Sequence, residues 1–143
     1  MIREYQEKDL SQIIAIWHEA QSIAHPFLQP EFVEEVKGMM QHQFIPNAKT
    51  WVFQTNEELI GFIAMMQNEI GGLFVKPKEQ QKGVGGMLLA YVSKFHERLE
   101  VEVFDKNNIG KPFYIKHGFV MSSEYVHDAT NQKVHRMLCF TNN

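Results

Sequence analysis

The chain has 143 residues, of which 44% are hydrophobic, 12% aromatic and 22% charged. This length suits one folded domain with a single core, and the composition excludes wholesale disorder. The 14 basic and 17 acidic side chains give a net charge of −3, without the basic excess that binding to a phosphate backbone leaves in a composition. We therefore expect a single domain over residues 1–143 and no nucleic-acid partner.

In the first half of the chain, apolar side chains recur at helical spacing and then at strand spacing. Asp9 is of a residue type that favours the N-cap of a helix, and Pro30 favours a first helical turn. Polar residues between two apolar runs predict a tight turn. The elements expected here are a strand over 2–5, helices over 9–20 and 30–40, and a hairpin of strands 51–54 and 59–66.

The second half predicts strands that alternate with helices and end in a hairpin. The expected elements are strand 69–75, helix 83–96, strand 100–104, helix 109–117 and strands 119–125 and 134–140. A β-α-β unit thus lies between two antiparallel hairpins. This order favours an α/β fold with a mixed, mostly antiparallel central sheet flanked by helices, and it argues against a helical bundle or a β-sandwich.

Cysteine content and hydropathy indicate the compartment. Cys139 has no second cysteine with which to form an internal disulfide, as in most cytosolic proteins. Its apolar neighbours favour a buried core cysteine, and a catalytic thiol is the alternative. No segment reaches the roughly 18 apolar residues of a membrane span, and residues 1–9 are charged and lack the hydrophobic core of a signal peptide. The sequence predicts a cytoplasmic protein with no membrane partner.

The most informative stretch is the polar turn between Val75 and the helix that follows. Glycines at positions 83, 85 and 86 open this helix and let the backbone approach a ligand closely. The first N–H groups of a helix have no intrahelical acceptor, and together with the positive helix end they favour an anionic group such as a pyrophosphate. A glycine-rich helix start without a ligand is the alternative interpretation.

Two common phosphate-binding motifs do not fit this turn. The P-loop pattern G-x-x-x-x-G-K-[ST] is absent, and the dinucleotide pattern G-x-G-x-x-G fails because Leu88 stands where its third glycine belongs. The pattern that remains, Gln80-x-x-Gly83-x-Gly85, matches the [Q/R]-x-x-G-x-[G/A] motif of the GNAT superfamily of N-acetyltransferases. The chain resembles that superfamily in this stretch.

A second stretch strengthens the resemblance. From Asn107 to Phe119 the chain reads N-N-I-G-K-P-F-Y-I-K-H-G-F, which is similar to the superfamily's N-x-x-[A/G]-x-x-F-Y-x-x-x-G-F segment at every anchor. Pro112 should confine the start of this helix to residues 109–111. Taken alone, Tyr114 suits a half-buried core residue. The matching order of the two motifs favours a functional role instead.

The resemblance implies a splayed central strand pair that holds acetyl-CoA as a co-substrate. It implies no metal, and the seven histidines show no zinc-type spacing. Backbone amides of the turn would bind the pyrophosphate, and the preceding strand and an asparagine would contact the pantetheine arm. The residues implied to bind the coenzyme are Leu73, Phe74, Val75, Gln80, Gln81, Lys82, Gly83, Val84, Gly85, Gly86 and Asn107. Independently of the resemblance, Gly71 and Gly72 within that strand indicate a bulge or close backbone approach.

Two side chains are implied to take part in catalysis. In the superfamily the tyrosine of the second motif lies by the thioester sulfur and often protonates the departing thiolate, which implies this role for Tyr114. Glu69 begins the strand of paired glycines, where some relatives keep a general base. An alkylamine is mostly protonated at neutral pH and must lose a proton before it attacks. A water chain without a single base, and a solvated edge charge, are the alternatives for Glu69.

The implied function is transfer of an acetyl group from acetyl-CoA to a primary amine by direct attack in a ternary complex. The resemblance is to small bacterial single-domain members, some of which acetylate protein lysines. A protein lysine, a peptide N-terminus and a small-molecule amine are all open as acceptors, and the assembly is a monomer or a homodimer. His25 lies in a loop that often borders the acceptor cleft. The alternative function is a non-catalytic coenzyme A-binding sensor or protein-binding module.

Overall fold

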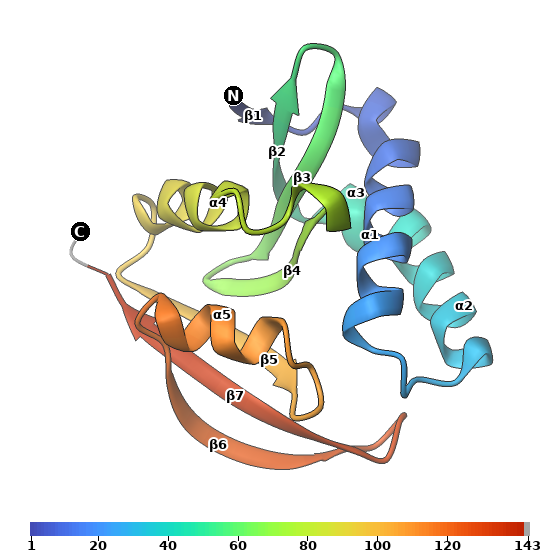
Figure 1. The fold of residues 1–143 in the computed structure, drawn as a ribbon, viewed down its shortest axis with the longest axis vertical. Coiled ribbons are helices and arrows are strands. Elements are labelled where there is room, and N and C mark those ends of the chain that lie inside the picture. Colours follow the sequence, from blue (N-terminus) through green and yellow to red (C-terminus); the bar gives the residue numbers. More distant parts are fainter. Residues whose placement is uncertain (142–143) are drawn as a thin grey trace.

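The computed structural model describes residues 1–141. Seven strands form one sheet, with helices on both faces (Figure 1). In chain order the elements are β1 (Ile2–Glu4), α1 (Leu10–Ala24), α2 (Pro30–Met39), α3 (Ile45–Asn47), β2 (Lys49–Thr55), β3 (Glu58–Met66), β4 (Glu69–Val75), α4 (Val84–Ser93), β5 (Arg98–Phe104), α5 (Gly110–Lys116), β6 (Val120–His127) and β7 (Gln132–Phe140). Two 3-10 turns, η1 (Glu7–Asp9) and η3 (Pro77–Glu79), and the π-helical turn η2 (Met40–Phe44) lie between them.

The strand order in the sheet is β1-β2-β3-β4-β5-β7-β6. Neighbouring strands are antiparallel except β4 and β5, which are parallel and connected through α4. The expected α/β fold with a mixed, mostly antiparallel sheet is thereby confirmed. β4 and β5 pair only at Glu69 with Glu100 and at Ile70 with Val101, and they diverge beyond this point (Figure 1). The splayed strand pair implied by the resemblance is therefore present.

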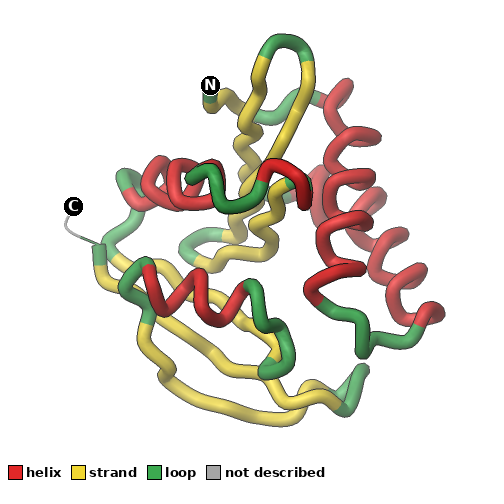
Figure 2. The backbone as a smooth tube through the Cα atoms, viewed as in Figure 1, coloured by secondary structure: helices red, strands yellow, loops and turns green. Residues whose placement is uncertain are grey.

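Two hydrophobic clusters lie on opposite faces of the sheet. The cluster beneath α4 and α5 contains side chains from both halves of the sheet, and Figure 2 shows these two helices in front of the strands. The cluster beneath α1 and η2 takes its strand residues from β2, β3 and β4. β3 belongs to both because successive side chains of a strand point to opposite faces: Ile63 and Met65 lie in the first cluster, and Phe62 and Ala64 in the second.

Asp9 has a different role from the helix cap that its position predicts. It precedes α1 but makes no side-chain capping bond with that helix. Its buried carboxylate accepts two hydrogen bonds from the Arg3 guanidinium, both 2.9 Å long, and one from the Gln6 N–H at 2.8 Å. Two parallel bonds to an arginine are stronger than one bond to a neutral N–H. Asp9 therefore joins β1 to the start of α1.

The second helix continues into a π-helical turn that its sequence does not predict. α2 stops at Met39 and the chain continues as η2, in which the Ile45 N–H donates to the Met40 carbonyl. Pro46 explains the change of helix type because it has no N–H for the carbonyl of residue 42. Turns of this kind are rare and are often found at functional sites. Here the turn ends in Phe44, which packs against the second cluster.

Candidate active site

The turn between β4 and α4 has the backbone conformation that its glycines predict. Gly83 is the N-cap of α4 with φ at +88°, and Gln81 is also left-handed with φ at +65°. Left-handed residues in such a turn help to direct successive N–H groups toward one side, as in the backbone concavities that bind anions. The Gln80 side chain supports the turn, because its Nε2 donates to the Val75 carbonyl at 3.0 Å.

Within residues 1–141, the backbone N–H groups from Gln81 to Gly86 have no hydrogen-bond acceptor. The first bond of the helix runs from the Met87 N–H to the Gly83 carbonyl at 3.0 Å. These free donors lie at the positive end of α4, which suits an anionic group. The exposed Lys82 ammonium pairs with Glu79 at 3.5 Å and adds a positive charge nearby. The backbone amides that the resemblance implies for pyrophosphate binding are therefore free and lie together at the start of α4.

A gap opens between β4 and β5 where their pairing ends. Gly71 is the extra residue of a bulge, because Met65 pairs with Ile70 while Ala64 pairs with Gly72. A bulge bends its strand, and here β4 turns away from β5. The strand residues expected to contact a coenzyme follow the bulge along this open edge: Leu73, Phe74 and Val75. The gap therefore runs from the bulge toward the free amides at the start of α4.

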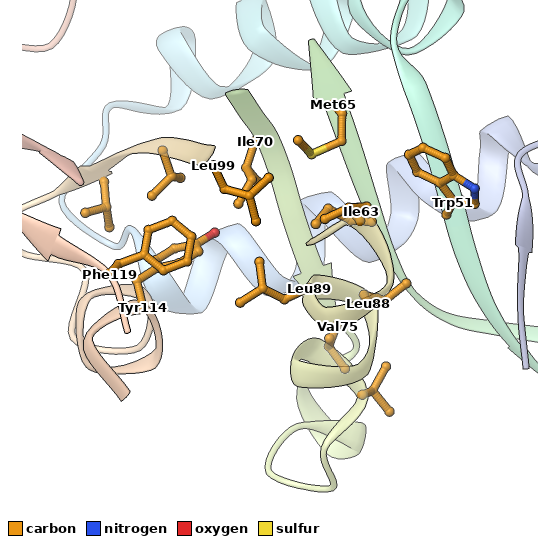
Figure 3. Close-up of a cluster of buried hydrophobic side chains, with 14 of the residues drawn as sticks. Trp51, Ile63, Met65, Ile70, Val75, Leu88, Leu89, Leu99, Tyr114 and Phe119 are labelled. Atoms are coloured by element: carbon orange, nitrogen blue, oxygen red, sulfur yellow. The ribbon is translucent and has the colours of Figure 1, made fainter. Parts of the chain in front are cut away.

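Tyr114 of α5 is 7% exposed and packs edge-on against Phe113 and Phe119, with ring centroids 5.2 and 5.1 Å away. Figure 3 shows the Tyr114 ring beside Phe119, with its hydroxyl pointing into the cluster. Within residues 1–141 this hydroxyl makes no hydrogen bond, and it is not one of the fully buried polar atoms that lack a partner, so it keeps some contact with solvent. Burial raises the pKa of the phenol well above its ordinary value. The hydroxyl therefore keeps its proton at neutral pH and can donate a hydrogen bond.

Asn107 fixes the beginning of the helix that carries Tyr114. Its Oδ1 accepts the N–H groups of Ile109 and Gly110, at 3.1 and 2.8 Å, and its side chain is almost completely buried. Its Nδ2 lies 3.1 Å from Nε2 of His25, in the loop between α1 and α2. A carboxamide nitrogen has two N–H groups, and the contact with His25 uses one of them. Asn107 therefore couples α5 to the loop between α1 and α2.

His25 lies among aromatic rings at the end of β5. Its ring centroid is 5.8 Å from that of Phe27 and 5.0 Å from that of Phe104, and Phe104 also contacts His127 at 5.7 Å. Burial lowers the pKa of His25 to about 4, so the ring is neutral and its Nε2 can accept the Asn107 N–H. Sequence analysis noted His25 but missed its ring contacts, because Phe104 lies far away in the sequence and aromatic residues in loops and at strand ends are common.

Replacing His25 with glutamine should flatten the pH dependence of stability. Between the ordinary histidine pKa of 6.5 and the folded value of about 4, the unfolded chain binds a proton that the folded chain does not. Stability of the wild type therefore falls as pH falls through this range, by up to about 1.4 kcal/mol per pH unit. In His25→Gln, urea unfolding should show that slope reduced by about 1 kcal/mol per pH unit. Equal slopes in both proteins would contradict a buried neutral His25, and His42→Gln, at an exposed histidine, is the matched control.

Glu69 lies at the closed end of the gap and forms an ion pair that sequence analysis missed. Its Oε2 is 3.0 Å from Nη2 of Arg136, whose Nε is 3.4 Å from Glu100. Ile70 belongs to the cluster beneath α4, so Glu69 points to the opposite face of the sheet. The other carboxylate oxygen has no partner within residues 1–141. A carboxylate paired with an arginine is thus present on the face of the sheet opposite α4, and no local sequence pattern reveals this distant arginine.

Residues 1–141 carry no sign of metal or thiol chemistry. That part of the chain holds no group of three or more histidine, cysteine or carboxylate side chains that could bind a metal ion. None of its helices is long and apolar enough to cross a membrane. Cys139 is free and half-buried beside the cluster under α4 and α5, and burial raises the pKa of its thiol. Because the thiolate is the reactive form, this environment disfavours a catalytic cysteine.

Residues 46–121 match the sequence model of the acetyltransferase (GNAT) domain. The chain belongs to the GNAT acetyltransferase family. It is 32% identical over 120 residues to the peptidyl-lysine N-acetyltransferase YiaC of Escherichia coli, covering 83% of this chain and 82% of that one. It is 29% identical to the peptidyl-lysine N-acetyltransferase YjaB of Salmonella typhimurium, covering 82% and 81%. The protein is therefore an N-acetyltransferase.

Solved structures agree with this GNAT assignment at the level of the fold. The solution structure of apo-form YjaB from Escherichia coli superposes with a TM-score of 0.86 at 24% identity, over 96% of this chain and 95% of that one. The PaiA N-acetyltransferase of Thermoplasma acidophilum, solved in complex with coenzyme A, superposes with a TM-score of 0.81 at 21% identity and 98% coverage of both chains. The splayed sheet is thus the fold of known acetyltransferases, one of which holds coenzyme A.

Proposed function

We propose that this GNAT protein transfers the acetyl group of acetyl-CoA to the side-chain amine of a protein lysine, by direct attack in a ternary complex. The observation that carries the reaction is the buried residue Tyr114, whose hydroxyl makes no hydrogen bond within residues 1–141, on a helix that packs on the same face of the sheet as the helix α4 with its free amides. The lysine acceptor is supported by two relatives named as peptidyl-lysine N-acetyltransferases. The cytoplasm is the proposed location, because the chain has a single cysteine and needs no disulfide.

The coenzyme is proposed to lie along β4. The N–H groups of residues 81–86 would bind its pyrophosphate, since they are free and lie at the positive end of α4. From there the pantetheine arm would run along the open edge of Leu73, Phe74 and Val75, with Asn107 on the other side of the gap. The thioester would then come to rest near Gly71. This path places the sulfur on the side of the sheet covered by α5, which carries Tyr114.

The chemistry needs two proton movements. The amine nitrogen forms a bond to the thioester carbon, the bond between that carbon and sulfur breaks, and the amine loses a proton. Glu69 would accept that proton, directly or through water, from the opposite face of the sheet. Tyr114 would donate its proton to the departing sulfur and regain one from solvent. Groups held in place for such transfers typically contribute about 10²–10⁴-fold to a rate.

The test of this function is thioester consumption with a panel of acceptors. Acetyl-CoA is incubated with the protein and lysine peptides whose N-termini are blocked, peptides with free N-termini but no lysine, polyamines or aminoglycosides. We expect turnover with the blocked lysine peptides above that with the other three. Turnover with only one of the other amine classes would show that this class is the acceptor and that protein lysine is not. Coenzyme binding without turnover on any amine would favour a non-catalytic sensor.

Glu69→Gln tests the proposed base. The substitution keeps the shape of the side chain but removes its basicity, so kcat/KM for the amine at pH 7 should fall by about tenfold or more. Because the free amine becomes abundant as pH approaches its pKa of about 10.4, the deficit should shrink as pH rises. The measurement is a pH profile of kcat/KM for the wild type and the variant.

Glu124→Gln is the matched control, since Glu124 is an exposed carboxylate that pairs with Lys133 at 3.2 Å on the outer strands. We expect its profile to follow the wild type. A deficit in Glu69→Gln that stays constant with pH would show that Glu69 positions Arg136 or the acceptor and is not the base. No deficit at any pH would favour the water chain.

A further inference from the structure

Phe44 lies directly against the bulge of β4. A Cβ atom built on Gly71 would overlap the Cζ atom of the Phe44 ring and lie 2.7 Å from its Cε1 atom. Real contacts of a Cβ are essentially never this short, so the tip of the ring occupies the space that a side chain at position 71 would need. A side chain at position 71 would therefore displace the Phe44 ring.

The surroundings of Phe44 hold its ring in place. Phe44 ends the π-helical turn η2, and its carbonyl accepts the Ala48 N–H at 2.9 Å. Its side chain packs against the cluster formed by α1, η2, β2 and β3, and is only half-exposed. Turns of the π type are uncommon and are often kept for function. The packing holds the Phe44 ring in place, and the ring contacts the β4 bulge from the face of the sheet that α1 covers.

The contact lies at the closed end of the gap between β4 and β5. Ile70 with Val101 is the last β4–β5 pair, and Gly71 is the next residue along β4. Val75, at the other end, is four residues further, or about 13 Å at roughly 3.3 Å per residue. A molecule that enters from α4 and follows β4 therefore meets the Phe44 ring with its far end.

We propose that Phe44 limits the acyl group that the enzyme transfers to the two carbons of acetyl. The inference rests on the proposed function, which places the thioester in this gap with its acyl end toward Gly71. A longer acyl chain would have to extend toward the Phe44 ring or toward the paired residues Ile70 and Val101. In the first direction the chain would meet the Phe44 ring, and in the second the buried side chains of Ile70 and Val101, and packed side chains resist extra methylene groups.

The experiment compares acetyl-, propionyl- and butyryl-CoA as donors with one saturating acceptor. For the wild type we expect kcat/KM to fall by about tenfold or more from acetyl to butyryl, since one methylene in a tight pocket changes selectivity by roughly 10–200-fold. In Phe44→Ala the ratio of butyryl to acetyl should rise by about tenfold or more. In Phe44→Leu, which keeps more of the packing, the ratio of butyryl to acetyl should rise less. This variant is the one to use if Phe44→Ala fails to fold.

Phe95→Ala is the matched control. Phe95 is a 55% exposed phenylalanine that stacks on Trp51, just beyond the C-terminal end of α4. Its donor ratios should equal those of the wild type. Unchanged ratios in both Phe44 variants would overturn the inference, as would a change in the acceptor KM alone, which would make Phe44 a wall of the acceptor site. An enzyme that uses no acyl-CoA at all fails the proposed function instead, so the two failures are separate.

Discussion

Tyr114→Phe should lower kcat by about tenfold or more while both KM values stay close to those of the wild type. Departing coenzyme A is a thiolate whose thiol pKa is roughly 8.5, and a donor beside the sulfur assists its release. The structure supports a clean experiment. The Tyr114 hydroxyl has no partner within residues 1–141, so its removal leaves no orphaned group, and the ring contacts to Phe113 and Phe119 persist. A loss in kcat alone marks an interaction made in the transition state.

Steady-state kinetics and thermal unfolding of the same samples decide the result. Tyr91→Phe is the matched control, because Tyr91 is a half-buried tyrosine on helix α4 whose ring contacts Trp51. The Tyr91→Phe variant should have the kcat of the wild type. Normal turnover of Tyr114→Phe would contradict its role as the acid, and an unfolded Tyr114→Phe would show that the hydroxyl serves the core.

Gly83→Gln should weaken coenzyme A binding by about tenfold or more, or about 1.4 kcal/mol. A Cβ at this position would meet only the end of Met87, at 4.0 Å, so the new side chain projects into the open space before the helix. That space is where the pyrophosphate is proposed to bind. Gln81 already adopts a left-handed backbone two residues earlier, which shows that this turn accepts a glutamine in that conformation, at a cost of about 1–2 kcal/mol in stability.

Isothermal titration with coenzyme A measures the loss. Gly38→Gln is the matched control, because Gly38 lies in α2 and a Cβ atom added to it would meet nothing within 4 Å. Its affinity for coenzyme A should equal that of the wild type. If Gly83→Gln folds and binds coenzyme A with wild-type affinity, the pyrophosphate does not bind at this turn.

The fold follows from local patterns where those patterns are strong. The strand over 69–75 has the bounds that Pro77 and the polar turn predict, and the helix after Asn107 begins at Gly110, close to the proline that limits it. The order of elements then leaves few arrangements of the sheet. Local patterns fail where a distant partner decides the structure, as for Asp9, whose bidentate contact with Arg3 replaces a helix cap.

The candidate site divides in the same way. The helix start at Gly83 could be predicted because its glycines and free amides all belong to one short segment of the sequence. The hydrogen bond between Asn107 and His25, the ion pair between Glu69 and Arg136, and the contact of Phe44 with the bulge each join residues far apart in the sequence. Such contacts form when distant segments pack together in the fold. The spacing of residues along the sequence does not predict them.

Within residues 1–141, two β4–β5 residue pairs are the only strand pairing between the two half-sheets, β1 to β4 and β5 to β6. Residues 2–75 supply the strands of one half and residues 98–140 those of the other. A coenzyme in the gap would touch both halves and bind only when they are correctly apposed. Because a ligand that binds the native state alone stabilises it by mass action, acetyl-CoA would also act as a clamp. The cellular supply of acetyl-CoA would then govern how long the enzyme resists proteolysis as well as how fast it works.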